Sequence, residues 1–357
     1  MDNTSKVVID LIRKAVDDSC HIDQQLLKQA NWSEVMAFCL SQGVVGICYD
    51  AIEKVEKACR PSREMLILWF GQVNLHENLY KQQKVTLSHL AQFYVQEGIM
   101  MLLLKGYGLS LFWPKPEHRP VGDIDCYNFG QQELDDKRIR EVYGIAIDNS
   151  HHKHSVFQFE NTMVENHYSF LNVYGHRSTA EIERILEEEL KNDLNINEDR
   201  KIKNLYYPSV RFNSLYLLRH SAEHFASVNI NLRQVLDWGF FVRANNVDWE
   251  WLICQLDKVG MKQYLAVLNA ICVRYLGFDA SLFPALDVDE KLVARSMNDI
   301  LSPEFQKERH KNALSEILYR YRRWNANRWK HDMVYRESAW QSLRTQVWSH
   351  VLKPSLR

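Results

Sequence analysis

Two aspartates separated by one residue are the strongest candidates for chemistry in this chain. Asp123 and Asp125 lie in the stretch EHRPVGDIDCYN, directly after a Pro-Val-Gly corner. Residues two apart on a strand project to the same face, so we expect both carboxylates to point together, with Ile124 and Cys126 in the core. Two carboxylates on one face can hold Mg²⁺ beside substrate phosphates, as phosphoryl transfer requires. Taken alone, most such pairs are solvated strand edges.

A third carboxylate follows downstream in the stretch TMVENHYSF. On a strand, Glu165 shares a face with Met163 and His167. Placed on a strand beside the two aspartates, Glu165 would complete a site of three carboxylates and help to deprotonate an acceptor hydroxyl. Glu160 is a competing candidate, but it lies at the turn of the same hairpin, where solvent exposure is the simpler interpretation.

A glycine turn precedes the aspartates in the stretch LLLKGYGLSLF, which has the pattern of a buried strand, a turn and a helix. Gly106 would let a phosphate approach the backbone closely, and the start of a helix attracts anions. Lys105 could add a positive charge to the same phosphates. The alternative is a plain corner between a strand and a helix.

The elements that must position these residues are predicted from periodicity. Residues 1–97 have helical patterns throughout, including a long run that ends at Gly98. Short apolar or alternating segments follow, with a hairpin around Asn161 and Thr162, and helical patterns return from about Ser178. The predicted fold class is α+β, with a small mixed sheet of four or five strands. The expected divisions are an N-terminal helical region at 1–97, a core at 98–176, a helical region forming the other wall of a cleft at 177–300, and a basic, Trp-rich tail at 301–357.

Composition narrows the class of protein further. The chain has 357 residues, 46% of them apolar, and a net charge of −1, so no global field favours nucleic acid and we expect no specific DNA binding. Its seven cysteines are scattered, with no C-x-x-C pair, which favours a reducing compartment. We find neither a signal peptide nor an apolar stretch long enough to span a membrane. The expected location is the cytoplasm.

Several of these motifs, in this order, resemble a known family. A strand, the LKG turn and a helix precede the loop FWPKPEHRP, which contains Arg119; GDID and a hairpin ending in ENH follow. This order resembles the uncharacterised nucleotidyltransferase family of the DNA polymerase β-like superfamily. The helical stretches FCLSQGVVGICYDAI and LLRHSAEHF, with NLRQVLDWGFFVRANNVDWEWL, extend the resemblance to roughly residues 30–275, and the ordered combination is more specific than any single motif.

The resemblance implies that Asp123, Asp125 and Glu165 hold Mg²⁺ or Mn²⁺. It further implies that an NMP is transferred from an NTP, with ATP the first expectation, and that pyrophosphate is released. The acceptor is left open between a small molecule, a protein and RNA. Lys105 and Arg119 would contact the phosphates.

The turn itself departs from the family pattern. The resemblance makes Gly106 the glycine that a phosphate approaches. Superfamily members usually have Gly-Ser or Gly-Gly there, whereas this chain has Tyr107 as the second residue. Ser110, one helical turn later, is the candidate substitute for the missing hydroxyl.

Histidines form two further groups. In HHKH, His152 and His154 share a strand face and could meet His167, which would permit a zinc site; polar lining of the cleft, or surface histidines, is the favoured interpretation. His220 and His224 are four apart on a helix, where buried, bracing histidines are favoured over a metal site. A candidate acceptor pocket comprises His154, His167, His220, His224, Arg233 and Asp237.

The C-terminal tail is basic and rich in tryptophan. From Ile317 onward it has a surplus of seven positive charges, so the rest of the chain carries −8. Packing of the tryptophans on a core is favoured over binding to RNA or a membrane. The leading hypothesis is a Mg²⁺-dependent nucleotidyltransferase. The alternatives are a non-catalytic nucleotide- or partner-binding relative, suggested by Tyr107, and a toxin-like enzyme that modifies tRNA or protein, suggested by the tail.

Overall fold

The computed structural model describes residues 1–192, 197–305, 313–342 and 344, which fall into two compact units. The first unit comprises Met1–Phe70, Leu217–Arg243 and Trp249–Gln341, and the second is built mainly from Gly71–Tyr216 with Ala244–Asp248. Helices α5 (Arg63–Glu97) and α9 (Val210–Ser227) contribute residues to both units.

The first unit consists of helices. Asn31 caps α3 by accepting a hydrogen bond from the backbone N–H of Glu34, and Gly43 ends the helix with a φ of 67°. The helices predicted within residues 1–97 are confirmed. Besides the shared α5 and α9, the helical elements of this unit are α1 (Asn3–Val16), α2 (Gln24–Lys28), α3 (Trp32–Gln42), α4 (Val45–Lys54), η1 (Lys57–Cys59), α10 (Leu232–Ala244), α11 (Trp249–Val259), α12 (Lys262–Leu276), η3 (Ala280–Leu282), α13 (Glu290–Leu301), α14 (Ala313–Ala326) and α15 (Arg328–Val334).

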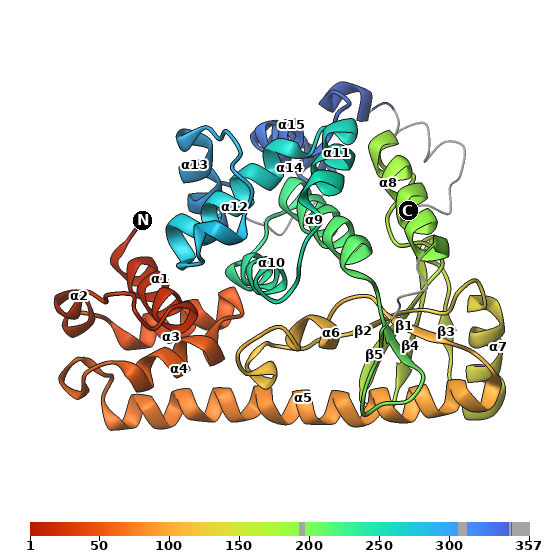
Figure 1. Cartoon of the computed structure of the whole chain (residues 1–357), viewed down its shortest axis with the longest axis horizontal. Helices are drawn as coiled ribbons and strands as arrows, with labels where there is room; N and C mark the ends of the chain where they lie inside the picture. The colour runs from red at the N-terminus through yellow and green to blue at the C-terminus, as the bar shows by residue number, and fades with distance from the viewer. Residues whose placement is uncertain (193–196, 306–312, 343, 345–357) are drawn as a thin grey trace. The chain divides into compact units, whose positions relative to one another are not determined.

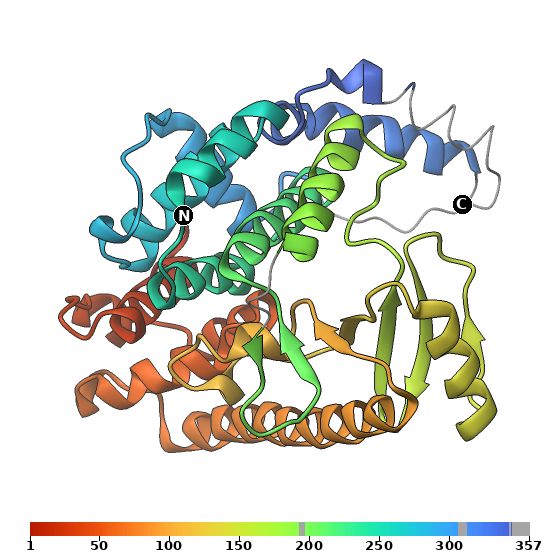
Figure 2. The ribbon, with the colours of Figure 1, turned by 45° about the vertical axis from the view of Figure 1, so that its right-hand side comes forward.

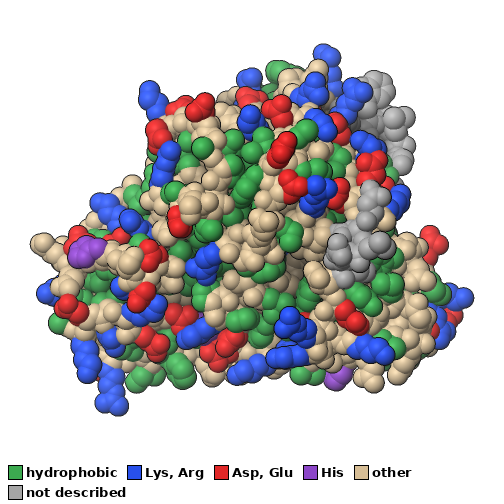
Figure 3. All heavy atoms as spheres, viewed as in Figure 1, with side chains coloured by type: hydrophobic (Ala, Val, Ile, Leu, Met, Phe, Trp, Pro, Cys, Tyr) green, Lys and Arg blue, Asp and Glu red, His purple; other side chains and the backbone are tan. Residues whose placement is uncertain are grey.

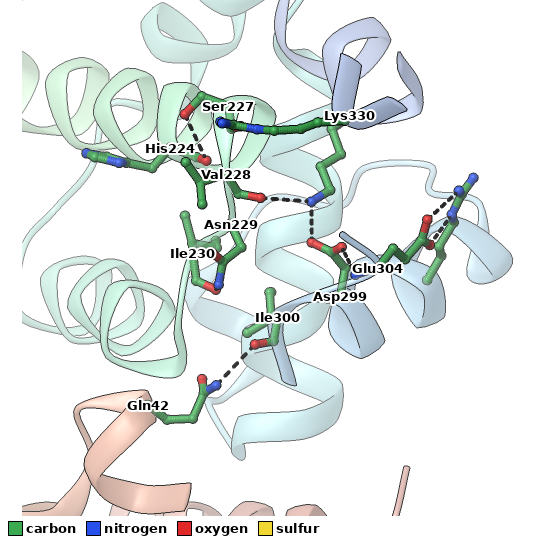
Figure 4. A network of polar contacts seen from close by, with 12 residues as sticks. Gln42, His224, Ser227, Val228, Asn229, Ile230, Asp299, Ile300, Glu304 and Lys330 are labelled. Atoms are coloured by element: carbon green, nitrogen blue, oxygen red, sulfur yellow. Dashed lines mark hydrogen bonds and ion pairs between the residues drawn. The ribbon is translucent and has the colours of Figure 1, made fainter. Parts of the chain in front are cut away.

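A buried lysine ties the C-terminal helices into this unit (Figure 4). The ammonium of Lys330 on α15 pairs with Asp299 on α13 and donates a hydrogen bond to the carbonyl oxygen of Val228 at 3.3 Å. The side chains of Lys330 and Asp299 are 1% and 0% exposed. This part of the basic tail therefore packs on the core of the unit. The tryptophans, whose packing was the favoured interpretation, differ: the ring of Trp329 contacts Phe225, whereas Trp340 is 57% exposed. Lys353, Arg357 and Trp348 lie outside the described residues.

The second unit is built around one mixed sheet with the strand order β3-β4-β5-β2-β1-β7-β6. The pairs β2–β5 and β1–β7 are parallel, and the other neighbours are antiparallel. The strands are β1 (Met101–Leu103), β2 (Ile124–Tyr127), β3 (Ile147–Asp148), β4 (His154–Phe159), β5 (Thr162–His167), β6 (Asn197–Glu198) and β7 (Leu205–Tyr207). The helices are the remainder of α5 and α9, α6 (Tyr107–Ser110), η2 (Pro116–His118), α7 (Gln132–Tyr143) and α8 (Arg177–Asn192).

Helix α5 covers one face of this sheet (Figures 1 and 2). Its buried residues, among them Leu87 and Tyr94, pack with Ile124 and Cys126 of β2 and Val164 of β5 in one apolar cluster. Because strand residues alternate between faces, Asp125 and Glu165 must lie on the opposite face. The alternation predicted for these strands is therefore confirmed.

The sheet has more strands than the sequence predicted. Its five strands between residues 98 and 176, including the hairpin, agree with the prediction, but β6 and β7 lie beyond residue 176, where helices alone were expected. These strands have two and three residues, too few to show a period of two. Asn204, with a φ of 67°, turns the chain before β7 and donates a side-chain hydrogen bond to the carbonyl of Ile99.

Charged side chains of both signs are interspersed on the face drawn in Figure 3, which agrees with the net charge of −1. Among the described residues, every helix is too short or too polar to span a bilayer.

The buried ion pair of Lys330 predicts a large effect on stability. We expect Lys330→Ala to lower the free energy of unfolding by about 3–5 kcal/mol, because it leaves Asp299 buried without its cation. Arg322→Ala, which removes an exposed cation from the same region, should change it by less than about 0.5 kcal/mol. Urea unfolding followed by circular dichroism measures the free energy of unfolding of each variant. Equal effects of the two substitutions would contradict the conclusion that the Lys330–Asp299 ion pair is buried and stabilising.

Candidate active site

Adjacent strands of the second unit bring three carboxylates together. Asp125 on β2 is the register partner of Glu165 on β5, and Asp123 directly precedes β2. One carboxylate oxygen from each of the three lies within 4.8 Å of the others. The sequence prediction that these side chains point together is confirmed, while their catalytic roles stay a prediction.

Asp125 is held by two nitrogen groups. Its Oδ1 is 2.8 Å from the ammonium of Lys105 and 3.0 Å from Nε2 of His167, and its side chain is 1% exposed. Burial alone would raise the pKa of Asp125, but Lys105 and His167 outweigh it and hold that pKa well below its usual range. Asp125 is therefore ionised at neutral pH.

The pKa values of the two neighbouring carboxylates shift in opposite directions. Burial, and then the negative charge of Asp125, raise the pKa of Asp123. The hydrogen bond with His167 lowers the pKa of Glu165, against the opposing effect of burial. Repulsion among the negative charges on this face therefore raises mainly the pKa of Asp123.

The donor set fits a divalent cation that prefers oxygen. Oδ2 of Asp125 is buried, and among the described residues it has no hydrogen-bond partner. A buried carboxylate oxygen without a partner is costly, and a bound cation would satisfy it. Carboxylate oxygens are the ligands that Mg²⁺ and Mn²⁺ prefer. The arrangement of Asp123, Asp125 and Glu165 therefore suits such an ion.

The glycine turn lies directly against this site. Gly106 has φ 60° and ψ −116°, and a Cβ there would lie 3.4 Å from the carbonyl oxygen of Asp123. Tyr107, the residue that departs from the family pattern, is 4% exposed and stacks on Tyr80 with ring centroids 5.2 Å apart. Its ring belongs to the apolar cluster under the sheet.

Ser110 is placed less favourably for its predicted role. The helix that follows the turn is the single turn α6, and Ser110 is buried within it. The Ser110 hydroxyl donates a hydrogen bond to the carbonyl oxygen of Tyr107 at 2.6 Å. A contact between Ser110 and a nucleotide stays a prediction. It is disfavoured because the Ser110 hydroxyl already donates its hydrogen to the carbonyl oxygen of Tyr107.

Helix α5 fixes the loop that leads to the aspartates. Gln83 donates to the carbonyl oxygen of Gly122 at 2.7 Å, and His118 contacts Glu77 at 3.2 Å. Arg119 is buried, and its guanidinium donates to the carbonyl oxygen of Pro120. Contact between Arg119 and phosphates stays a prediction.

Glu160, the competing carboxylate, accepts hydrogen bonds from Thr86 and contacts His89, both on α5. It lies at the hairpin turn, where it was predicted, and not in the cluster of three carboxylates.

The predicted acceptor pocket is divided between the two units. His154 and His167 lie beside Glu165, with a nitrogen of each 3.5 Å from its Oε2. The remaining members lie in the first unit, so one shared pocket stays a prediction. Those members are His220 and His224 on α9, with ring centroids 4.6 Å apart, and Arg233 and Asp237 on α10.

One expectation for the histidine pair was wrong. His220 is half-buried and His224 is exposed, whereas both were expected to be buried. The pair occurs near the C-terminal end of α9, which is less enclosed than the apolar middle of that helix.

A polar network on the helix-covered face of the sheet was missed by the sequence analysis. Asp136 on α7 accepts hydrogen bonds from Ser155 on β4, Asn166 on β5 and Tyr168. The available signal was the sequence LDDKRI, in which both aspartates fall on the helix face that Ile139 makes apolar.

Comparison with known proteins identifies one related family. The profile of a family described as an uncharacterised nucleotidyltransferase matches residues 28–277. No curated protein and no solved structure gives a significant match.

The buried carboxyl of Asp135 predicts a pH-dependent stability. Tyr94 and Asn128 donate hydrogen bonds to it, and burial raises its pKa to about 8, above about 3.9 in the unfolded chain. Its stabilising effect is therefore complete below about pH 3.9 and is lost as pH rises through 8. Asp135→Asn keeps an accepting oxygen and does not titrate.

We expect the wild type to lose up to about 1.4 kcal/mol of unfolding free energy per pH unit relative to Asp135→Asn between pH 6 and 8. Denaturant unfolding at several pH values measures this difference. Glu133→Gln, an exposed carboxylate on the same helix, serves as the control and should follow the wild type. Parallel profiles for wild type and Asp135→Asn would refute the raised pKa.

Proposed function

Because the chain belongs to the uncharacterised nucleotidyltransferase family, we propose that it transfers an NMP from an NTP, with ATP the first candidate, to an acceptor hydroxyl. The observation that carries the proposal is the cluster of Asp123, Asp125 and Glu165, in which one oxygen of Asp125 is buried without a partner. Mg²⁺ or Mn²⁺ held by these carboxylates would neutralise the triphosphate and stabilise the attacking and leaving oxygens.

The residues of the chain have distinct tasks in this reaction. Lys105 neutralises Asp125 and keeps its carboxylate in one orientation. The turn at Gly106, which has no side chain, would let the triphosphate approach the backbone closely. The oxygen of the acceptor bonds to the α-phosphorus as the bond to the β-phosphate oxygen breaks, and pyrophosphate leaves. The hydroxyl proton passes to an ionised carboxylate, for which Glu165 is the candidate.

The position of Tyr107 favours the enzyme over a non-catalytic relative. The non-catalytic alternative was suggested by the bulky side chain that follows Gly106, but that side chain packs in the apolar cluster. The seven cysteines are all free thiols, which suits the reducing conditions of the cytoplasm, the location that we propose. The acceptor could be a small molecule, a protein or RNA, so the test must sample all three.

Transfer of label from α-³²P-labelled NTPs tests the proposal. Purified protein is incubated with each of the four NTPs, Mg²⁺ and a cell extract; label is followed in the small-molecule, protein and RNA fractions, and pyrophosphate release is measured. We expect label in one fraction that is absent with the double variant Asp123→Asn/Asp125→Asn. No transfer and no pyrophosphate with any NTP would overturn the proposal, whereas label in RNA would favour the toxin-like alternative acting on RNA.

The hairpin offers a matched pair of substitutions. We expect Glu165→Gln to lower the rate of transfer by at least about 100-fold, because it removes a charge from the cluster. Glu160→Gln makes the same chemical change at the turn of the same hairpin and should leave the rate within about twofold. Equal losses in the two variants would remove Glu165 from the site.

A further inference from the structure

A second group of potential ligands lies on the β4–β5 hairpin. His154 and His167 are opposite each other in the register, and Oε2 of Glu165 lies 3.5 Å from a ring nitrogen of each. A ring nitrogen from each histidine and one oxygen of Glu165 all lie within 4.8 Å of one another. This group shares Glu165 with the cluster of aspartates but has nitrogen donors, which that cluster lacks.

His167 is oriented as a metal ligand would be. Its Nδ1 lies 3.1 Å from the carbonyl oxygen of Ser169, and since a carbonyl oxygen only accepts, Nδ1 carries the hydrogen. Nε2 then faces Oδ1 of Asp125 at 3.0 Å and Oε2 of Glu165 at 3.5 Å. Histidines that bind metals commonly donate their other N–H to a backbone carbonyl. In the metal-free protein a proton between Nε2 and these carboxylates supplies the positive charge beside them, and a metal ion bound at Nε2 would take its place.

His154 supplies a nitrogen without a partner. Its Nδ1 is buried, and within the part of the chain that the structure describes it makes no hydrogen bond, although it lies 3.5 Å from Oε2 of Glu165. The side chain is 11% exposed. A buried ring nitrogen without a partner, beside a carboxylate oxygen, is placed to serve as a metal ligand.

We propose that His154, Glu165 and His167 form a binding site for one divalent transition-metal ion, of which Zn²⁺ is the reference. Two imidazoles and one carboxylate, with a further position open to water or substrate, are a donor set that proteins use for such ions. Ligands about 2.0–2.2 Å from a tetrahedral ion lie roughly 3.4 Å apart. The two distances of 3.5 Å from Glu165 to the histidines match that spacing.

The site goes beyond the proposed function, because it needs neither nucleotide nor acceptor. Mg²⁺ avoids nitrogen ligands, so the histidines select a different ion from the one expected at the aspartates. The alternative explanation is that the histidines and carboxylates are linked only by hydrogen bonds and bind no metal ion. A measurement of metal binding distinguishes these two explanations.

Binding of Zn²⁺ to tag-free, full-length protein that has been stripped with a chelator tests the proposal. The affinity is measured by competition with a chromophoric chelator, and we expect one tight site. His154→Ala should weaken Zn²⁺ binding by at least about 10–100-fold. His152→Ala, a neighbouring histidine that contacts Asn172 instead, should change it by less than about threefold.

A measurement on the wild type removes any dependence on folding of the variants. With Co²⁺ in place of Zn²⁺, proton NMR should show a paramagnetically shifted, exchangeable imidazole N–H, contributed by Nδ1–H of His167. Absence of that signal in protein loaded with one equivalent of Co²⁺, or equal Zn²⁺ affinity in the wild type and His154→Ala, would overturn the proposal.

The measurement of Zn²⁺ binding does not depend on whether the protein transfers a nucleotide. Asp123→Asn removes a carboxylate that is not a ligand of this site, so it should abolish transfer yet leave Zn²⁺ binding within about threefold. Zn²⁺ binding without any transfer would reject the proposed function and keep the metal site, and transfer without Zn²⁺ binding would do the reverse.

Discussion

One buried carboxylate sets the requirements for the rest of the second unit. Asp125 is 1% exposed and stays ionised because Lys105 and His167 both contact its Oδ1. A charge buried in this way without partners would cost several kcal/mol. The two partners come from the end of β1 and from β5, on either side of β2. The site therefore exists only while these three strands keep their register.

Hydrogen bonds on the helix-covered face of the sheet help to fix that register. Asp136 accepts hydrogen bonds from Ser155 on β4 and Asn166 on β5, and so ties the hairpin to α7. A slip of one residue would turn Glu165 into the apolar cluster and bring Val164 or Asn166 into the site. Polar bonds on one face thus hold in place the side chains that act on the other.

The sequence predicted the parts of the site that depend on local periodicity. Alternation placed Asp123 and Asp125 together, and placed Glu165 on a face with His167, because both follow from a period of two. Periodicity carries no information on which cation faces which carboxylate. The pairing of the Lys105 ammonium with Asp125 was not predicted, and its contact with phosphates stays a prediction. The short β6 and β7, and the polar side of α7, also depend on tertiary contacts that a local pattern does not contain.

The charge balance of the site explains why bound cations are needed for the proposed chemistry. Asp125 and Glu165 are held ionised, and a triphosphate would add more negative charge to a partly buried face. Lys105 is already paired with Asp125, and α6 is a single turn that offers little helix dipole. A divalent ion held by the carboxylates would supply positive charge for the proposed transfer. Glu165, with carboxylate oxygens on one side and imidazoles on the other, is placed to contact two ions of different preference.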